Sequence, residues 1–138
     1  MRPDVLDLHG LLAALQWQND EFSSRTNIVS ELFSNVDDVN FDQDINIAVF
    51  RIFQEALNNI AKHAKATKVR IDIKKQKKEF VLKIKDDGIG FDLKISDKKQ
   101  TFGLLGMRER TLLCGGEMDV ISKKGKGTEL QFKIPLGK

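Results

Sequence analysis

Hydrophobic residues recur at helical spacing along residues 42–64, the longest patterned stretch of the chain. An α-helix turns about 100° per residue, so with Glu55 placed at zero the apolar positions fall between about 60° and 140°. These apolar positions are Ile45, Val49, Ile52, Ala56 and Ile60. The stretch therefore predicts one long amphipathic helix, with Asp42 as its N-cap.

Polar side chains border the apolar face of this predicted helix. Asn59 falls at about 40° and Lys62 at about −20°, so both form a polar stripe with Glu55 beside the core. Asn58 falls near −60°, toward water, whereas His63 falls near 80°, on the apolar side. Carboxylate and amide oxygens suit Mg²⁺, which keeps several waters and is shared with phosphate groups. Taken alone, the stripe is more typical of a solvated helix flank than of a cation site.

Alternating apolar and polar positions predict strands, and helical spacing predicts two further helices. The strands are expected at residues 28–33, 69–74, 80–85, 117–122 and 128–135. The further helices are expected at residues 7–22 and 102–114. Together these elements favour a two-layer α/β sandwich, in which three helices cover one face of a mixed, mostly antiparallel sheet of about five strands.

Composition restricts the class of protein. The 138 residues suit one domain, and a net charge of +3 from 23 basic and 20 acidic residues is weak support for a nucleic-acid partner. No apolar run approaches the roughly 20 residues that span a bilayer, so we expect no membrane contact. A single cysteine, Cys114, excludes an internal disulfide and favours a cytoplasmic location.

Glycines gather at three places where the backbone could approach a ligand. The clusters are Gly88 with Gly90, Gly103 with Gly106, and Gly125 with Gly127 before Thr128. Glycine allows close backbone approach, and the N-terminus of a helix presents free N–H groups to phosphates. Asp87, at the end of a predicted strand, could accept a hydrogen bond from the exocyclic amine that marks adenine. The spacing matches neither a P-loop nor a Rossmann fingerprint.

Four segments resemble the asparagine box and the successive glycine boxes of the sensor histidine kinase ATP-binding domain. In chain order they read QEALNNIAKHAKA, DDGIGFD, FGLLGMRER and GKGTELQFKIP. That domain belongs to the family shared with gyrase, the Hsp90 chaperones and the MutL proteins, and the resemblance implies its Bergerat-type ATP-binding fold. The first and third segments, with the N-terminal RPDVLDLHGLLAALQWQNDEF, look most like the nitrate- and nitrite-sensor kinases.

The resemblance implies a site for ATP and Mg²⁺. Asn59 would ligate the Mg²⁺ that bridges the phosphates, and Glu55 would act near the same cation as a second catalytic residue. Lys62 or His63 would face the phosphate end. The start of the next helix would bind the phosphates through Gly103, Leu104 and Gly106.

The adenine side and the lid follow from the same resemblance. Asp87 would accept from the adenine amine, Gly88 and Gly90 would give the base room, and Thr128 would support this side. Residues 93–102 would form a lid over ATP.

The lid departs from the family pattern at one point. Many relatives place another glycine and a histidine before the GLLGM run, where this chain has Thr101 and Phe102. The resemblance therefore does not extend to the hinge of the lid or to its phosphate contact.

The resemblance further implies that the γ-phosphate passes to a histidine on a separate dimerisation hairpin, with a response regulator as an indirect partner. His9 lacks the acidic neighbour of such an acceptor, and His63 lies on the nucleotide helix. We therefore expect residues 1–26 to be the remnant of a linker from that hairpin and residues 27–138 to be the catalytic domain. The parent protein could be anchored in a membrane.

Two alternative functions remain open from the sequence. One is an ATP hydrolase of the same fold, with Glu55 as general base toward water. The other is a regulatory module that binds nucleotide without catalysis. Fold analogy does not choose among these functions.

Overall fold

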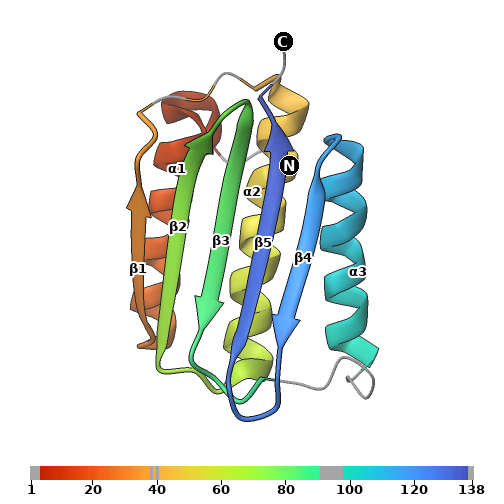
Figure 1. Cartoon of the computed structure of the whole chain (residues 1–138). Helices are drawn as coiled ribbons and strands as arrows, with labels where there is room; N and C mark the ends of the chain where they lie inside the picture. Colours follow the sequence, from red (N-terminus) through yellow and green to blue (C-terminus); the bar gives the residue numbers. More distant parts are fainter. Residues whose placement is uncertain (1–3, 38, 40, 91–97, 137–138) are drawn as a thin grey trace.

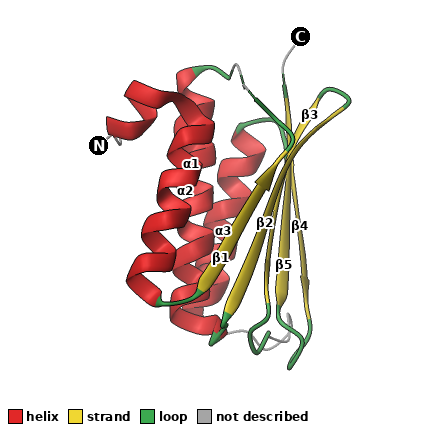
Figure 2. Cartoon of the chain, turned by 90° about the vertical axis from the view of Figure 1, so that its left-hand side faces the viewer, coloured by secondary structure: helices red, strands yellow, loops and turns green. Residues whose placement is uncertain are grey.

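A mixed β-sheet forms one layer of the structure, and the helices form the other layer on a single face of that sheet (Figures 1 and 2). The computed structural model describes residues 4–37, 39, 41–90 and 98–136. Within these residues the sheet has five strands in the order β1-β2-β3-β5-β4. The strands are β1 (Val29–Ser34), β2 (Lys68–Gln76), β3 (Glu79–Asp86), β4 (Glu117–Ser122) and β5 (Thr128–Pro135). The helices are α1 (Asp4–Thr26), α2 (Gln43–Asn59), η1 (Ile60–Ala64) and α3 (Lys98–Leu113).

Strand pairing confirms the predicted architecture. β1 pairs with β2 in parallel, and the pairs β2–β3, β3–β5 and β4–β5 are antiparallel. Side chains alternate between the faces, so Ile71 on β2 and Leu82 on β3 are fully buried beneath the helices, while Arg70 and Lys85 lie exposed on the other face. This two-layer sandwich with one polar sheet face is the fold class that the sequence pattern predicts.

α1 belongs to the same core as the rest of the chain. Its helical path is interrupted at Gly10, where φ is 84° and ψ is 175°. Beyond this kink, Leu15 and Phe22 are fully buried in the core that α2 and the sheet share. Residues 27–138 alone would therefore lack these core side chains. The expected division after residue 26, into a linker remnant and a catalytic domain, stays a prediction.

The long helix predicted over residues 42–64 is continuous but changes its pitch. α2 starts after Asp42, whose carbonyl oxygen accepts the backbone N–H groups of Ile45 and Asn46 at 3.0 Å, although its side chain makes no capping hydrogen bond. After Asn59 the chain widens into one π-helical turn, η1. π-turns change the angle between successive residues and are frequent at functional sites.

α3 starts earlier than the sequence pattern predicts. The helix begins at Lys98, so Gly103 and Gly106 lie inside it and not at its N-terminus. Residues such as Lys98, Lys99 and Gln100 have high helix propensity, which their polarity obscured in the sequence. Of the lid expected over residues 93–102, residues 93–97 lie outside the described residues. Among the described residues, no helix is both long and apolar enough to cross a bilayer.

Candidate functional site

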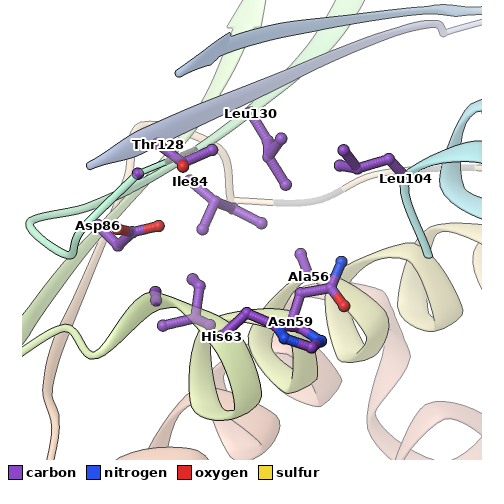
Figure 3. A pocket seen from close by; sticks show the side chains of 11 residues that line it. Ala56, Asn59, His63, Ile84, Asp86, Leu104, Thr128 and Leu130 are labelled. Carbon is purple, nitrogen blue, oxygen red and sulfur yellow. The ribbon is translucent and has the colours of Figure 1, made fainter. Parts of the chain in front are cut away.

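A cavity lies between the helical layer and the end of the sheet where β3 finishes (Figure 3). Asn59 and His63 face it from the helices, and Asp86 and Thr128 face it from β3 and β5. Leu104 of α3 closes a third side. The cavity measures about 30 Å³, which is room for about one or two water molecules.

Asp86 supplies the buried carboxylate of this cavity. The residue is 4% exposed, and the backbone N–H of Gly88 donates to its Oδ1 at 2.8 Å. Burial raises the pKa of Asp86, against the opposing effect of hydrogen bonds from the backbone N–H groups of Gly88 and Thr128. The cavity thus presents one strong acceptor in an otherwise largely apolar wall that includes Ile84 and Leu130.

Asp87, which the sequence favoured as the adenine acceptor, lies outside this cavity. Its carboxylate accepts the backbone N–H groups of Thr67 and Lys68 at 2.8 and 3.0 Å, and the Thr67 hydroxyl at 2.7 Å. The hydroxyl of Thr67, then the N–H of Lys68, hold the pKa of Asp87 below its usual value. Asp87 therefore links the end of β3 to the start of β2. It points away from the cavity because successive residues of a strand point to opposite faces of the sheet.

Two glycines of the first cluster are required by backbone packing. A Cβ on Gly88 would lie 2.1 Å from the carbonyl oxygen of Ala64, at the end of η1. A Cβ on Gly90, where φ is +64°, would lie 2.1 Å from the carbonyl oxygen of Lys123. The loop after β3 therefore touches both η1 and the turn between β4 and β5. Gly90 also lines the cavity, whereas Gly88 acts through its hydrogen bond to Asp86.

Gly103 brings α3 against the polar stripe of α2. A Cβ at Gly103 would lie 2.9 Å from Nδ2 of Asn59 and 3.1 Å from Oε1 of Glu55. The absence of a side chain is what allows the two helices to meet at this point. A Cβ at Gly106 would have its nearest contact, Nη1 of Arg110, at 3.7 Å, so Gly106 neither lines the cavity nor crowds the stripe.

Only some of the neighbouring polar residues of the long helix line the cavity. Asn59 lines it and Asn58 does not, as the helical angles predicted. His63 is half-buried and lines the cavity, whereas Lys62 is exposed and lies outside the lining. Both residues follow the change to π-helical pitch after Asn59, so the ideal angle of 100° per residue no longer places them.

The sequence of a known family matches most of the chain. The family described as "Histidine kinase-, DNA gyrase B-, and HSP90-like ATPase" matches residues 44–138. This chain belongs to that ATPase family. The predicted family resemblance is therefore confirmed, and the region that carries it includes every residue around the cavity.

Relatives of this ATPase domain are named as sensor kinases. The signal transduction histidine-protein kinase/phosphatase DegS of Bacillus subtilis is 36% identical over 98% of this chain and 36% of the relative. The sensor histidine kinase LiaS of the same organism is 35% identical over 99% of this chain and 37% of the relative. The chain thus spans just over a third of these relatives. The finer likeness to nitrate- and nitrite-sensor kinases stays a prediction.

Solved structures share the fold of this ATPase domain. A blue-light activated histidine kinase of Erythrobacter litoralis superposes with a TM-score of 0.77 at 19% identity, over 96% of this chain and 43% of that one. The histidine kinase AdeS of Acinetobacter baumannii gives a TM-score of 0.71 at 17% identity, over 93% of this chain and 64% of that one. At these identities the likeness shows the fold alone.

The polar stripe of the ATPase domain offers oxygen ligands of the kind that Mg²⁺ prefers. Oε1 of Glu55 and Oδ1 of Asn59 lie on one helix face. They are 3.1 and 3.0 Å from the position that a Cβ on Gly103 would take. Among the described residues no group of three or more His, Cys, Asp or Glu side chains gathers around one point. A fully protein-built cage is therefore absent there, whereas a pair of oxygen donors fits a cation that keeps waters and shares phosphate oxygens.

Proposed function

We propose that this chain is the Mg·ATP-binding catalytic domain of a two-component sensor histidine kinase. It would transfer the γ-phosphoryl group of ATP to a histidine on a separate dimerisation hairpin, and a response regulator would act downstream in the cytoplasm. The observation that carries the proposal is the buried carboxylate of Asp86, which faces Asn59 and His63 across a cavity of the ATPase family's fold. The kinase names of DegS and LiaS support the reaction class.

Asp86 would recognise the adenine base. A buried carboxylate held by the N–H of Gly88 keeps its remaining lone pairs for an exocyclic amine. Apolar side chains of Ile84 and Leu130 line the adjoining wall and suit the faces of a flat base. Thr128 is paired with Asp86 across β3 and β5, and its hydroxyl lies 2.8 Å from that of Ser122. Thr128 would thus support the adenine side, as the family resemblance implies.

The polar stripe of α2 would hold the phosphate end. Asn59 and Glu55 would supply oxygen ligands to Mg²⁺, and His63 would donate to a phosphate oxygen from the cavity wall. Mg²⁺, when bound, neutralises phosphate charge and orients the γ-phosphoryl group for in-line transfer. Gly103 and Leu104 of α3 lie beside the same end, while the exposed Lys62 would reach it only with its long side chain.

A transfer assay tests this proposal against its alternatives. The domain is mixed with radiolabelled ATP and the dimerisation hairpin of its own parent protein, because transfer requires the acceptor nitrogen in line with the γ-phosphate. Acid-labile, base-stable label on the hairpin is expected. Label on this chain would place the acceptor at His9 or His63. Phosphate release without labelled protein would favour the hydrolase, and binding with neither outcome would favour the regulatory module.

A further inference from the structure

A second hollow lies on the opposite face of the sheet from the nucleotide cavity. Figure 2 shows that none of the described helices covers this face. The hollow measures about 330 Å³, which is at the lower end of the range for small-molecule sites. Its walls come from the start of β2, the end of β3 and the turn between β4 and β5.

The walls of this hollow are strongly basic. Lys68, Arg70, Lys85 and Lys126 line it, against the two carboxylates of Asp86 and Asp87. Asp87 already accepts three hydrogen bonds from Thr67 and Lys68, and Asp86 is buried with its carboxylate toward the nucleotide cavity. The four basic side chains therefore outnumber the two carboxylates in the walls of the hollow, although Asp87 keeps its negative charge.

Strand register places two of these cationic side chains opposite each other, where they repel. Arg70 on β2 stands directly opposite Lys85 on β3. Like charges directly opposite each other destabilise an antiparallel pair, although the ion pair of Arg70 with Asp72 offsets part of this repulsion. Glu129 stands opposite Lys85 on β5, yet no ion pair joins these two side chains within the described residues.

The four cations differ in what they can still bind. Nε of Arg70 lies 3.1 Å from Oδ2 of Asp72, and its guanidinium lies 4.4 Å from the ring centre of Phe33. In contrast, the ammonium groups of Lys68, Lys85 and Lys126 have no ion-pair partner among the residues that the structure describes. Lysine binds phosphate as a point charge, whereas flat carboxylates favour a free arginine fork.

We propose that this hollow binds a small anion that carries two or more linked phosphate groups. Three free ammonium groups on three different elements match the spread charge of an oligophosphate better than a single carboxylate. The inference does not depend on the proposed function, because the hollow and the nucleotide cavity open on opposite faces of the sheet and share only Asp86.

Calorimetric titration of the whole chain with inorganic triphosphate, without Mg²⁺ and at low salt, tests this site. Binding at one site is expected, and the double variant Lys85→Gln, Lys126→Gln should weaken it by roughly tenfold or more. The matched control is the double variant Lys74→Gln, Lys83→Gln, because both lysines lie on the same open face of the sheet but outside the hollow. An equal loss in the control would show a general charge effect and overturn the proposal.

A second arm separates the hollow from the nucleotide cavity. His63→Ala removes the side chain that would donate to a phosphate oxygen in that cavity without Mg²⁺, and it should leave triphosphate binding unchanged. Loss of binding in this variant would place the anion in the nucleotide cavity and overturn the proposal, as would no binding by the unmodified chain. Titration with monophosphate should give much weaker binding; equal affinity would refute the requirement for linked phosphates.

Discussion

Replacing Asp86 with asparagine is the sharpest test of the nucleotide site. The substitution keeps the size of the side chain and one acceptor oxygen for the N–H of Gly88. It replaces the other oxygen with an N–H₂ donor, which would face the donor amine of adenine. The site would then lose both a charge and an acceptor, with no change in packing volume.

The size of the effect follows from the burial of Asp86. At 4% exposure, water cannot take the place of the lost acceptor. A hydrogen bond to a charged group contributes about 1.5–3 kcal/mol, which corresponds to an affinity loss of roughly 10- to 150-fold. Burial also raises the pKa of Asp86. Protonation of this carboxylate at acid pH would abolish binding of the adenine amine.

Calorimetry with ATP on the unmodified chain and the two variants Asp86→Asn and Asp87→Asn provides the assay. Asp87→Asn is the matched control, since it makes the same chemical change one residue away, outside the cavity. We expect the loss of affinity in Asp86→Asn alone. A loss confined to Asp87→Asn in a folded protein would refute the assignment and restore the expectation from the sequence.

Three further predictions follow from the same geometry. Asn59→Ala should weaken Mg·ATP binding in calorimetry, whereas Asn58→Ala should not; equal behaviour would show that the helix register is misassigned. Gly103→Ala should weaken Mg·ATP binding in calorimetry because its Cβ, 2.9 Å from Nδ2 of Asn59, would push aside the ends of the Asn59 and Glu55 side chains, whereas Gly106→Ala should raise helix stability by up to about 1 kcal/mol. The lowered pKa of Asp87 means that its ionised form stabilises the fold above the ordinary aspartate pKa, and that this contribution is lost as the pH falls through the lowered value. Thermal melts should therefore show that Asp87→Asn destabilises most near neutral pH and progressively less in acid; a pH-independent difference would contradict this.

Local periodicity was sufficient for the sheet. Residues such as Ile71 and Leu82 alternate with charged neighbours, and that alternation depends only on which side of the strand faces the helices. The same rule, extended two residues past Ile84, would have pointed Asp86 into the core and Asp87 away from it. The sequence contained that signal, but the glycine motif drew the assignment to Asp87, and which of the two aspartates accepts from adenine stays a prediction.

The helices show where local patterns stop being informative. Nothing in the residues of η1 marks a change to π-helical pitch. Only the tertiary structure shows that Ala64, at the end of this turn, lies against Gly88 and accepts the N–H of Ile89 at 2.7 Å. The early start of α3 at Lys98 could have been found from helix propensity, although the polar composition favoured a loop. The contact between Gly103 and the polar stripe joins residues over 40 positions apart and needs the tertiary structure.

Because the cavity beside Leu104 is narrow, the affinity for nucleotide would depend on the balance between a closed and an open conformation of its walls. A space of about 30 Å³ is too small for a purine base, so we expect binding to draw on conformations in which the walls have moved apart. The measured dissociation constant is then the intrinsic one divided by the population of open molecules, and each 1.4 kcal/mol of opening cost weakens apparent binding tenfold. Anything that shifts α3, and Leu104 with it, relative to α2 would thus tune ATP occupancy through the population of open molecules.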